Sequence, residues 1–168
     1  DTEGIVAGIQ GSFISERNLS WFGIFFRRMF MLPGSTGLGR MQASGFPSYV
    51  VLPNKVIDVD MICGGNTSYR CEVLDQFKWN ELFSGYSYME DDDYSYRVSR
   101  EFCLVQTPAA RLIHEQYPVA RDNIEKLMRM EVRNHTLFFK LNRPKTLWNF
   151  VAFIWSEICC CRLSFCCY

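Results

Sequence analysis

The sequence predicts an α/β domain followed by a helical extension. Strand-like and helix-like segments alternate between residues 3 and 114, an order that is typical of a sheet covered by helices. The chain has 168 residues, of which 48% are hydrophobic and 15% aromatic, so it can build one sizeable core and is too apolar to be disordered. We therefore expect one globular domain, or part of one.

The first third of the chain predicts a strand, a helix and a loop. Residues 3–14 form a short apolar run with glycines, which indicates a strand. Residues 19–32 place aromatic and aliphatic side chains around Arg27 and Arg28, a pattern that fits either a buried helix, which we favour, or a helix at a membrane interface. Residues 33–53 are rich in Gly, Ser and Pro, so turns and a mobile surface loop are expected.

The middle of the chain predicts further strands and helices in alternation. Apolar and polar residues alternate within residues 55–63, which is the mark of a strand, and the strand leads into a Gly-Gly-Asn turn. Residues 68–77 predict a helix that Ser68 caps, and residues 94–102 predict a second helix. Residues 103–114 are expected to form one or two strands that end at His114.

The last third predicts a basic helical region followed by an apolar tail. Residues 118–145 carry seven cations against three acids. Residues 146–168 are apolar apart from Glu157 and Arg162, and they contain Trp148 and Trp155, a residue type favoured at membrane interfaces. The tail is just long enough to span a bilayer, for which about 20 residues suffice, although the central Glu157 opposes insertion. We expect a helix in or on a membrane, with the domain on the cytoplasmic side; a helix packed on the domain is the alternative.

Charge and cysteine content narrow the class of protein. Eighteen basic residues balance eighteen acidic ones, so no global field indicates a nucleic-acid partner. Five of the eight cysteines lie in the last ten residues and none has the CxxC spacing of a zinc site, so we expect neither a disulfide scaffold nor a structural metal. The chain begins with neither Met nor a charged leader, and we expect it to be a fragment of a longer protein.

Four carboxylates, those of Glu90, Asp91, Asp92 and Asp93, stand side by side in a chain of zero net charge. Each of them raises the free energy of ionising the next, so such a cluster needs a physical reason. The simplest reason is a solvated acidic turn at the start of a helix, where acids suit the helix dipole. In that turn Asp93 and Arg97, one helical turn apart, are expected to form an ion pair, and Asp92 is expected to be exposed.

Motifs around this cluster follow an order that resembles the second half of the catalytic domain of family 2 glycosyltransferases, enzymes of the GT-A fold. The resemblance covers about half of the chain, from residue 59 to residue 144. Its motifs are the turn Gly64, Gly65 and Asn66; then Ser68, Tyr69 and Arg70; then Phe83, Gly85 and Tyr86; then Glu90, Asp91, Asp93 and Arg97; then His114; and finally Arg133 and Asn134. By this resemblance residues 1–117 are the C-terminal part of a GT-A domain with an incomplete mixed sheet.

The resemblance also implies a reaction. The protein would transfer a sugar from a nucleotide sugar to a hydroxyl of a glycan or lipid-linked acceptor, with inversion and with Mg or Mn. Direct displacement needs a base opposite the leaving phosphate, and a carboxylate can serve as that base at neutral pH. By the resemblance Asp91 is the base and Glu90 shapes the acceptor site. The remaining substrate contacts are assigned to Gly64, Gly65, Asn66, Arg70, Asp93 and Arg97.

Metal binding and donor binding are implied in the same way. His114 is a ligand of the divalent metal by the resemblance, with a structural role as an equal alternative, and His135 is expected to be structural. The metal-binding Asp-x-Asp of the family lies upstream of Asp1, so Asp58 and Asp60 match its letters by coincidence. Without that upstream half, the chain by itself should not bind the donor.

Two rival interpretations stay open. In one, the chain is a non-catalytic, membrane-anchored domain whose acidic loop binds a cation or a basic partner. In the other, it has a glycosyltransferase-like fold without activity. A calcium loop of the EF-hand type is not expected, because the acids are contiguous rather than alternate.

Overall fold

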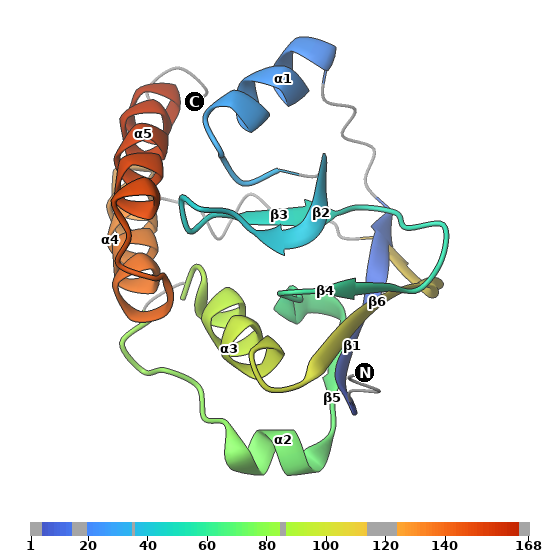
Figure 1. Cartoon of the computed structure of the whole chain (residues 1–168). Coiled ribbons are helices and arrows are strands. Elements are labelled where there is room, and N and C mark those ends of the chain that lie inside the picture. The colour runs from blue at the N-terminus through green and yellow to red at the C-terminus, as the bar shows by residue number, and fades with distance from the viewer. Residues whose placement is uncertain (1–4, 15–19, 35, 85–86, 114–123, 165–168) are drawn as a thin grey trace.

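The computed structural model describes residues 5–14, 20–34, 36–84, 87–113 and 124–164 (Figure 1). Its centre is a four-stranded sheet in the order β4-β6-β1-β5. The strands are β1 (Val6–Ile14), β4 (Ile57–Val59), β5 (Thr67–Tyr69) and β6 (Cys103–Ile113). Strands β1 and β6 run parallel, whereas β4 and β5 run antiparallel to their neighbours. The predicted α/β class and the mixed sheet are therefore confirmed.

The sheet is closely packed around β1, where two glycines leave room for neighbouring groups. A Cβ at Gly8 would lie 2.8 Å from the Tyr69 ring. A Cβ at Gly11 would lie 2.4 Å from Asn66 Nδ2 and 2.8 Å from the carbonyl oxygen of Ala110. The two glycines thus allow β5, and the Gly-Gly-Asn turn before it, to approach β1 closely.

The main core lies between the sheet and two helices, α2 (Cys71–Gln76) and α3 (Glu90–Ser99) (Figure 1). Its buried side chains are Ala7, Val59, Ile62, Val73, Tyr94, Val98 and Leu104. The predicted cap at Ser68 is wrong: Ser68 lies in β5, where it pairs with Ile9, and α2 begins at Cys71. Strand pairing with a distant segment decides the position of Ser68, and the local helix pattern does not contain that information.

Residues 36–50 form a hairpin of β2 (Thr36–Met41) and β3 (Pro47–Val50), so the predicted surface loop is wrong for this segment. The small residues that suggested a loop allow the hairpin to form. Gly39 and Gly45 have φ values of 71° and 88°, which favour glycine. The hairpin packs on a second buried cluster made of Met41, Met61, Phe83, Met89, Tyr96 and Phe138.

Helix α1 (Trp21–Met29) is exposed along one side, so the favoured prediction of a buried helix is wrong. Its inner side contributes Phe26, which packs with Phe30 against a third cluster of Leu32, Phe46 and Cys159. Apolar residues occupy almost every side of α1, but only the side that carries Phe26 packs on the rest of the protein.

Helices α4 (Ile124–Asn142) and α5 (Leu147–Ser164) lie side by side at one edge of the molecule (Figure 1). Phe139 of α4 stacks on Phe153 of α5 with 4.5 Å between the ring centroids. His135 is 1% exposed and pairs through Nδ1 with Glu157, which agrees with the structural role expected for it. Among the described residues, no helix combines the length and the apolarity needed to cross a membrane.

Candidate active site

The acidic cluster occupies the first turn of α3, which faces the turn η1 (Gly64–Asn66). Met89, the residue before the helix, has a φ of 67° in the left-handed region. From this start the four side chains diverge. Glu90 and Asp91 are half-buried, whereas Asp92 and Asp93 are buried. Each carboxylate therefore has its own environment, although the four are adjacent in sequence.

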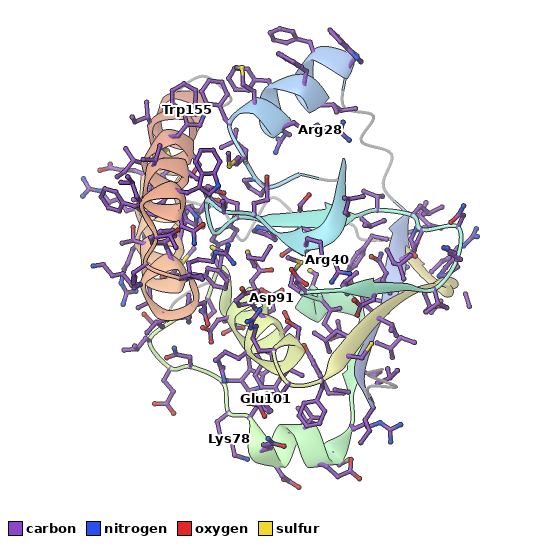
Figure 2. All side chains as sticks on the ribbon, in the orientation of Figure 1. Arg28, Arg40, Lys78, Asp91, Glu101 and Trp155 are labelled. Atoms are coloured by element: carbon purple, nitrogen blue, oxygen red, sulfur yellow. The ribbon has the colours of Figure 1, made fainter. Side chains whose placement is uncertain are left out.

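Asp91 lies on α3 (Figure 2) and is bound to the backbone of the glycine turn. Its Oδ2 accepts a hydrogen bond from the N–H of Gly64 at 2.8 Å, and its Oδ1 accepts one from the N–H of Asp92 at 3.0 Å. Gly64 itself is exposed. Two segments that the sequence assigned to one site thus meet in space, and both remain accessible to a ligand.

Asp92 is 3% exposed, so the prediction that it is exposed was wrong. The hydroxyl of Tyr49, on β3, donates a hydrogen bond to Asp92 Oδ1. Burial, and then the negative charge of Asp91, raise the pKa of the Asp92 carboxyl well above its ordinary value, and the Tyr49 bond opposes this only in part. The buried Asp92 carboxyl therefore holds a proton more readily than an ordinary aspartate does.

Asp93 is fully buried between two partners that the protein supplies. Arg97 lies 3.0 Å from its Oδ2, so the predicted ion pair one helical turn apart is confirmed. Asn142 of α4 donates to its Oδ1 at 2.7 Å, and Arg97 also donates to the carbonyl oxygen of Lys78 at 2.8 Å. These contacts brace α3 against α4 and the segment after α2. Contact of Asp93 and Arg97 with a substrate stays a prediction.

Asn66 closes the turn with an amide that has no partner. Its Nδ2 is buried, lies beside Gly11 and makes no hydrogen bond to any described residue. Next to it, the side chain of Gln10 accepts a hydrogen bond from the N–H of Cys63 at 3.0 Å. Burial, followed by the charge of Asp91, raises the pKa of the Cys63 thiol to about 12, so this sulfur stays protonated at neutral pH.

Arg70 and the Arg133–Asn134 pair lie at the borders of the site. The Nε of Arg70 donates to the carbonyl oxygen of Val6 at 2.7 Å, a contact that ties the end of β5 to β1. Asn134 donates to the carbonyl oxygen of Tyr88 at 2.9 Å, and Arg133 donates to Ser84 at 3.2 Å. Helix α4 thereby holds the segment that leads into the acidic turn. Arg70 as a substrate contact stays a prediction.

The described residues offer no metal cage. None of their His, Cys, Asp and Glu side chains form a group of three or more that could hold a metal ion. In the acidic turn, Asp92 and Asp93 are directed to Tyr49 and Arg97 rather than to a common point. His114, Gly85 and Tyr86 lie outside the described residues. Binding of Mg or Mn therefore stays a prediction.

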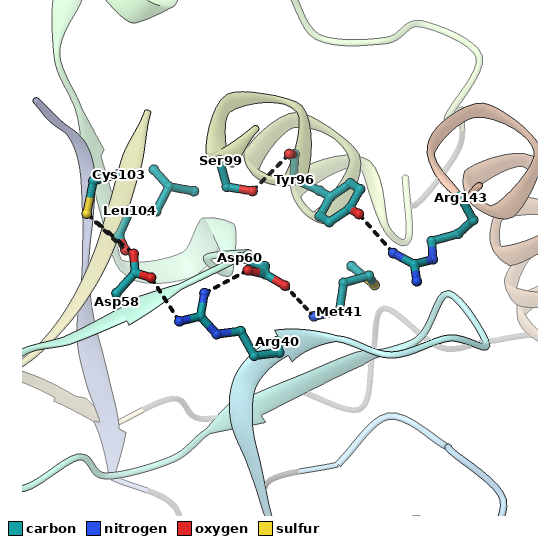
Figure 3. A network of polar contacts seen from close by, with 9 residues as sticks. All are labelled: Arg40, Met41, Asp58, Asp60, Tyr96, Ser99, Cys103, Leu104 and Arg143. Carbon is teal, nitrogen blue, oxygen red and sulfur yellow. Dashed lines mark hydrogen bonds and ion pairs between the residues drawn. The ribbon is translucent and has the colours of Figure 1, made fainter. Parts of the chain in front are cut away.

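Asp58 and Asp60 belong to a separate network on β2 and β4 (Figure 3). Arg40 pairs with both carboxylates at 2.9 Å, and Asp60 also accepts a hydrogen bond from the N–H of Met41 at 2.9 Å. Their environment is that of a brace between the hairpin and the central sheet. This agrees with the interpretation that their Asp-x-Asp spacing is a coincidence.

Two residues that shape the site, Tyr49 and Gln10, were not among those predicted from the sequence. Tyr49 lies in the segment that was expected to be a loop, and Gln10 lies in the middle of an apolar strand. The one available signal was the position of Gln10, because a buried polar residue in a strand needs a hydrogen-bond partner. Its partner, the Cys63 N–H directly before the glycine turn, is remote in sequence.

Comparison of the chain with protein-family models, with curated proteins and with solved structures finds no match. The function is therefore inferred from the residues of the site itself.

Proposed function

We propose that the chain is the C-terminal part of the catalytic domain of a family 2 glycosyltransferase with the GT-A fold. The enzyme transfers a sugar from a nucleotide sugar to a hydroxyl of a glycan or lipid-linked acceptor, with inversion. The observation that carries this proposal is the hydrogen bond between Asp91 and the backbone of Gly64. The proposed base and the proposed substrate-binding turn come from distant motifs and lie in direct contact.

The sheet supports the same proposal. Strand β5 is an edge strand, because the order is β4-β6-β1-β5. An edge strand presents unpaired backbone groups that another strand can pair with. The upstream half of the proposed domain would extend the sheet from β5, next to the turn that leads into it. The Asp-x-Asp motif and the nucleotide site of that half would then lie near Asp91.

In the proposed reaction Asp91 acts as the general base. Its two oxygens each accept one hydrogen bond from the backbone, and an ionised carboxylate has about four acceptor positions, so further positions are available for an acceptor hydroxyl. Asp91 takes the hydroxyl proton while that oxygen bonds to the anomeric carbon. The bond from this carbon to the diphosphate oxygen breaks on the opposite face, and the nucleoside diphosphate leaves. One displacement with one base inverts the configuration.

The environment of Asp91 suits this role. Asp92 is buried whereas Asp91 is half-buried, so Asp91 is the one of the two that a substrate can reach. The Asn66 amide nitrogen is buried behind the glycine turn, so contact of Asn66 with a sugar stays a proposal that rests on the resemblance. Gly64 and Gly65 are exposed and lack side chains, so a ligand can approach their backbone. Glu90, half-buried beside Asp91, is proposed to border the acceptor.

A divalent cation, Mg or Mn, would supply charge neutralisation of the leaving diphosphate. His114 is proposed as one ligand, with the others in the upstream half. The acids of α3 are not proposed as ligands, because Asp92 and Asp93 face protein partners. The same divergence removes support from the rival in which the acidic loop binds a cation or a basic partner.

The test uses the protein extended by the residues that precede Asp1. Nucleoside diphosphate release from a panel of nucleotide sugars is measured with Mg, with Mn and with a chelator. We expect release with at least one donor, its loss with the chelator, and no donor binding by the 168-residue chain in calorimetry. Absence of release across the panel, or tight donor binding by the 168-residue chain, would contradict the proposal.

A further inference from the structure

The outer side of α1 is unusually apolar for a protein surface. Trp21 is 78% exposed, Phe22 66% and Phe25 51%. Trp21, Phe25 and Met29 recur every four positions, and Phe22 precedes Phe25 by three, so these residues lie on the same side of the helix. Trp21 stacks on Phe25 with 5.9 Å between the ring centroids, which gives the exposed rings a fixed arrangement. Soluble proteins rarely expose such a contiguous apolar patch unless it binds something.

Helix α5 adjoins the C-terminal end of α1 and exposes apolar residues of its own. Trp155 of α5 stacks on Phe30, just after α1, with 4.9 Å between the centroids, and its Nε1 donates to the carbonyl oxygen of Met29 at 3.1 Å (Figure 2). Val151, Trp155 and Ile158 are all exposed and also follow a helical spacing. We call the combined surface the aromatic face; it consists of Trp21, Phe22, Phe25, Met29, Val151, Trp155 and Ile158.

Two cations lie on α1 itself, next to the aromatic face. Arg27 and Arg28 lie in the last turn of α1, and the sequence contains no Asp or Glu between residues 17 and 57. The acid of α5, Glu157, pairs with the buried His135 of α4 instead of lying on the outer face. An apolar surface rich in Trp and Phe beside cations complements the interface of a bilayer that carries anionic headgroups.

We propose that the aromatic face docks on the surface of an anionic phospholipid bilayer, with rings of both α1 and α5 among the headgroups. The inference is independent of the transferase activity. It assigns α1, the helix near the start of the chain, a part in membrane attachment equal to that of the apolar tail. The two helices then hold the domain at two points, which fixes its orientation on the membrane better than one helix would.

The experiment is co-sedimentation of the 168-residue chain with vesicles of phosphatidylcholine alone, and with vesicles in which phosphatidylglycerol replaces part of it. The variant Trp21→Ser/Phe22→Ser/Phe25→Ser removes the α1 half of the face. Leu38→Ser/Leu52→Ser is the matched control, because these side chains are 81% and 51% exposed and lie on the β2–β3 side. We expect binding to the anionic vesicles, about tenfold or more weaker in the triple variant and unchanged in the control.

Equal binding by the triple variant, or no binding to anionic vesicles by the wild-type chain, would overturn the proposal. So would self-association of the wild-type chain that the triple variant abolishes, because the face would then be an interface between copies. A second measurement needs no variant. Tryptophan fluorescence of the wild-type chain is expected to be quenched by bromine-labelled lipid chains, and an absence of quenching would also overturn it.

Discussion

The carboxylate of Asp91 accepts a hydrogen bond from the backbone N–H of Gly64, which lies 27 positions earlier in the chain. The bond joins the first turn of α3 to the turn that follows β4, and it holds the half-buried carboxylate at a glycine backbone that a ligand can reach. Around it, Asp92 and Asp93 are turned into the protein, where Tyr49 and Arg97 bind them. Position in the helix thus separates one chemically available acid from two structural ones.

The stability of the protein should depend on pH through Asp92. The pKa of Asp92 is raised above its ordinary value of 3.8, so above that pH the folded chain binds more protons than the unfolded chain. Its contribution to stability is complete below about pH 3.8 and is lost as the pH rises toward the folded-state pKa. Asp92→Asn keeps an oxygen for the Tyr49 hydroxyl and removes this loss.

Thermal unfolding from pH 4 to pH 8 measures the effect. The Tm of Asp92→Asn should exceed that of the wild type near pH 7, and the difference should shrink as the pH falls. Asp75→Asn, at an exposed position on α2, is the control and should show a nearly constant difference. A constant difference for Asp92→Asn as well would contradict the raised pKa.

Loss of the Tyr49 hydroxyl should be costly, because it leaves a buried carboxyl oxygen of Asp92 without its donor. Tyr49→Phe is expected to lower the free energy of unfolding by about 1–3 kcal/mol. Tyr94→Phe is the matched control, since the buried Tyr94 hydroxyl has no hydrogen-bond partner among the described residues, and it should be neutral or slightly stabilising. Urea unfolding compares the two, and equal effects would refute the role given to Tyr49.

The pair of His135 and Glu157 should hold α5 on α4. Glu157→Ala leaves Nδ1 of the buried His135 ring without its partner and is expected to cost about 1–3 kcal/mol in urea unfolding. On α4, which also carries His135, Glu125 pairs with Arg129 in solvent. Glu125→Ala should therefore cost less than about 1 kcal/mol. Similar costs for both substitutions would mean that the buried pair does not anchor α5.

Gly11 should be required for the position of Asn66. Gly11→Ala places a Cβ 2.4 Å from Asn66 Nδ2 and 2.8 Å from a backbone oxygen, so it should lower both the Tm and the transfer rate. At Gly23 of α1 a Cβ would meet only Ser20 Oγ, at 3.4 Å, and Gly23→Ala should stabilise the helix by about 0.5–1 kcal/mol. A neutral Gly11→Ala would show that β1 and the glycine turn are not packed as closely as described.

The features that sequence predicts well here are those set by local patterns. Alternation identified the strand at residues 57–59. The helix predicted at residues 94–102 exists, but it begins four residues earlier, at Glu90, and ends at Ser99. The Asp93–Arg97 pair followed from helical spacing alone. The α/β class followed from the alternation of these elements, whereas the GT-A fold and the transferase activity remain proposals.

The features that sequence missed depend on distant partners. The burial of Asp92 depends on Tyr49. Tyr49 belongs to the β2–β3 hairpin, which was predicted to be a loop because the segment is rich in Gly, Ser and Pro. The exposure of α1 could not be predicted because its apolar residues do not mark a single inward side. In both cases the local residue types are compatible with two environments, and the tertiary contacts select one of them.

The rate of sugar transfer by Asp91→Asn, in the longer enzyme that we propose, tests the central claim most directly. Asn keeps an oxygen that can accept from the Gly64 N–H but cannot take a proton at neutral pH, so the rate should fall by about 10²–10⁴-fold with little change in Tm. Asp75→Asn should leave the rate unchanged. A rate near that of the wild type, or a loss of activity explained by unfolding, would contradict the assignment of Asp91 as the base.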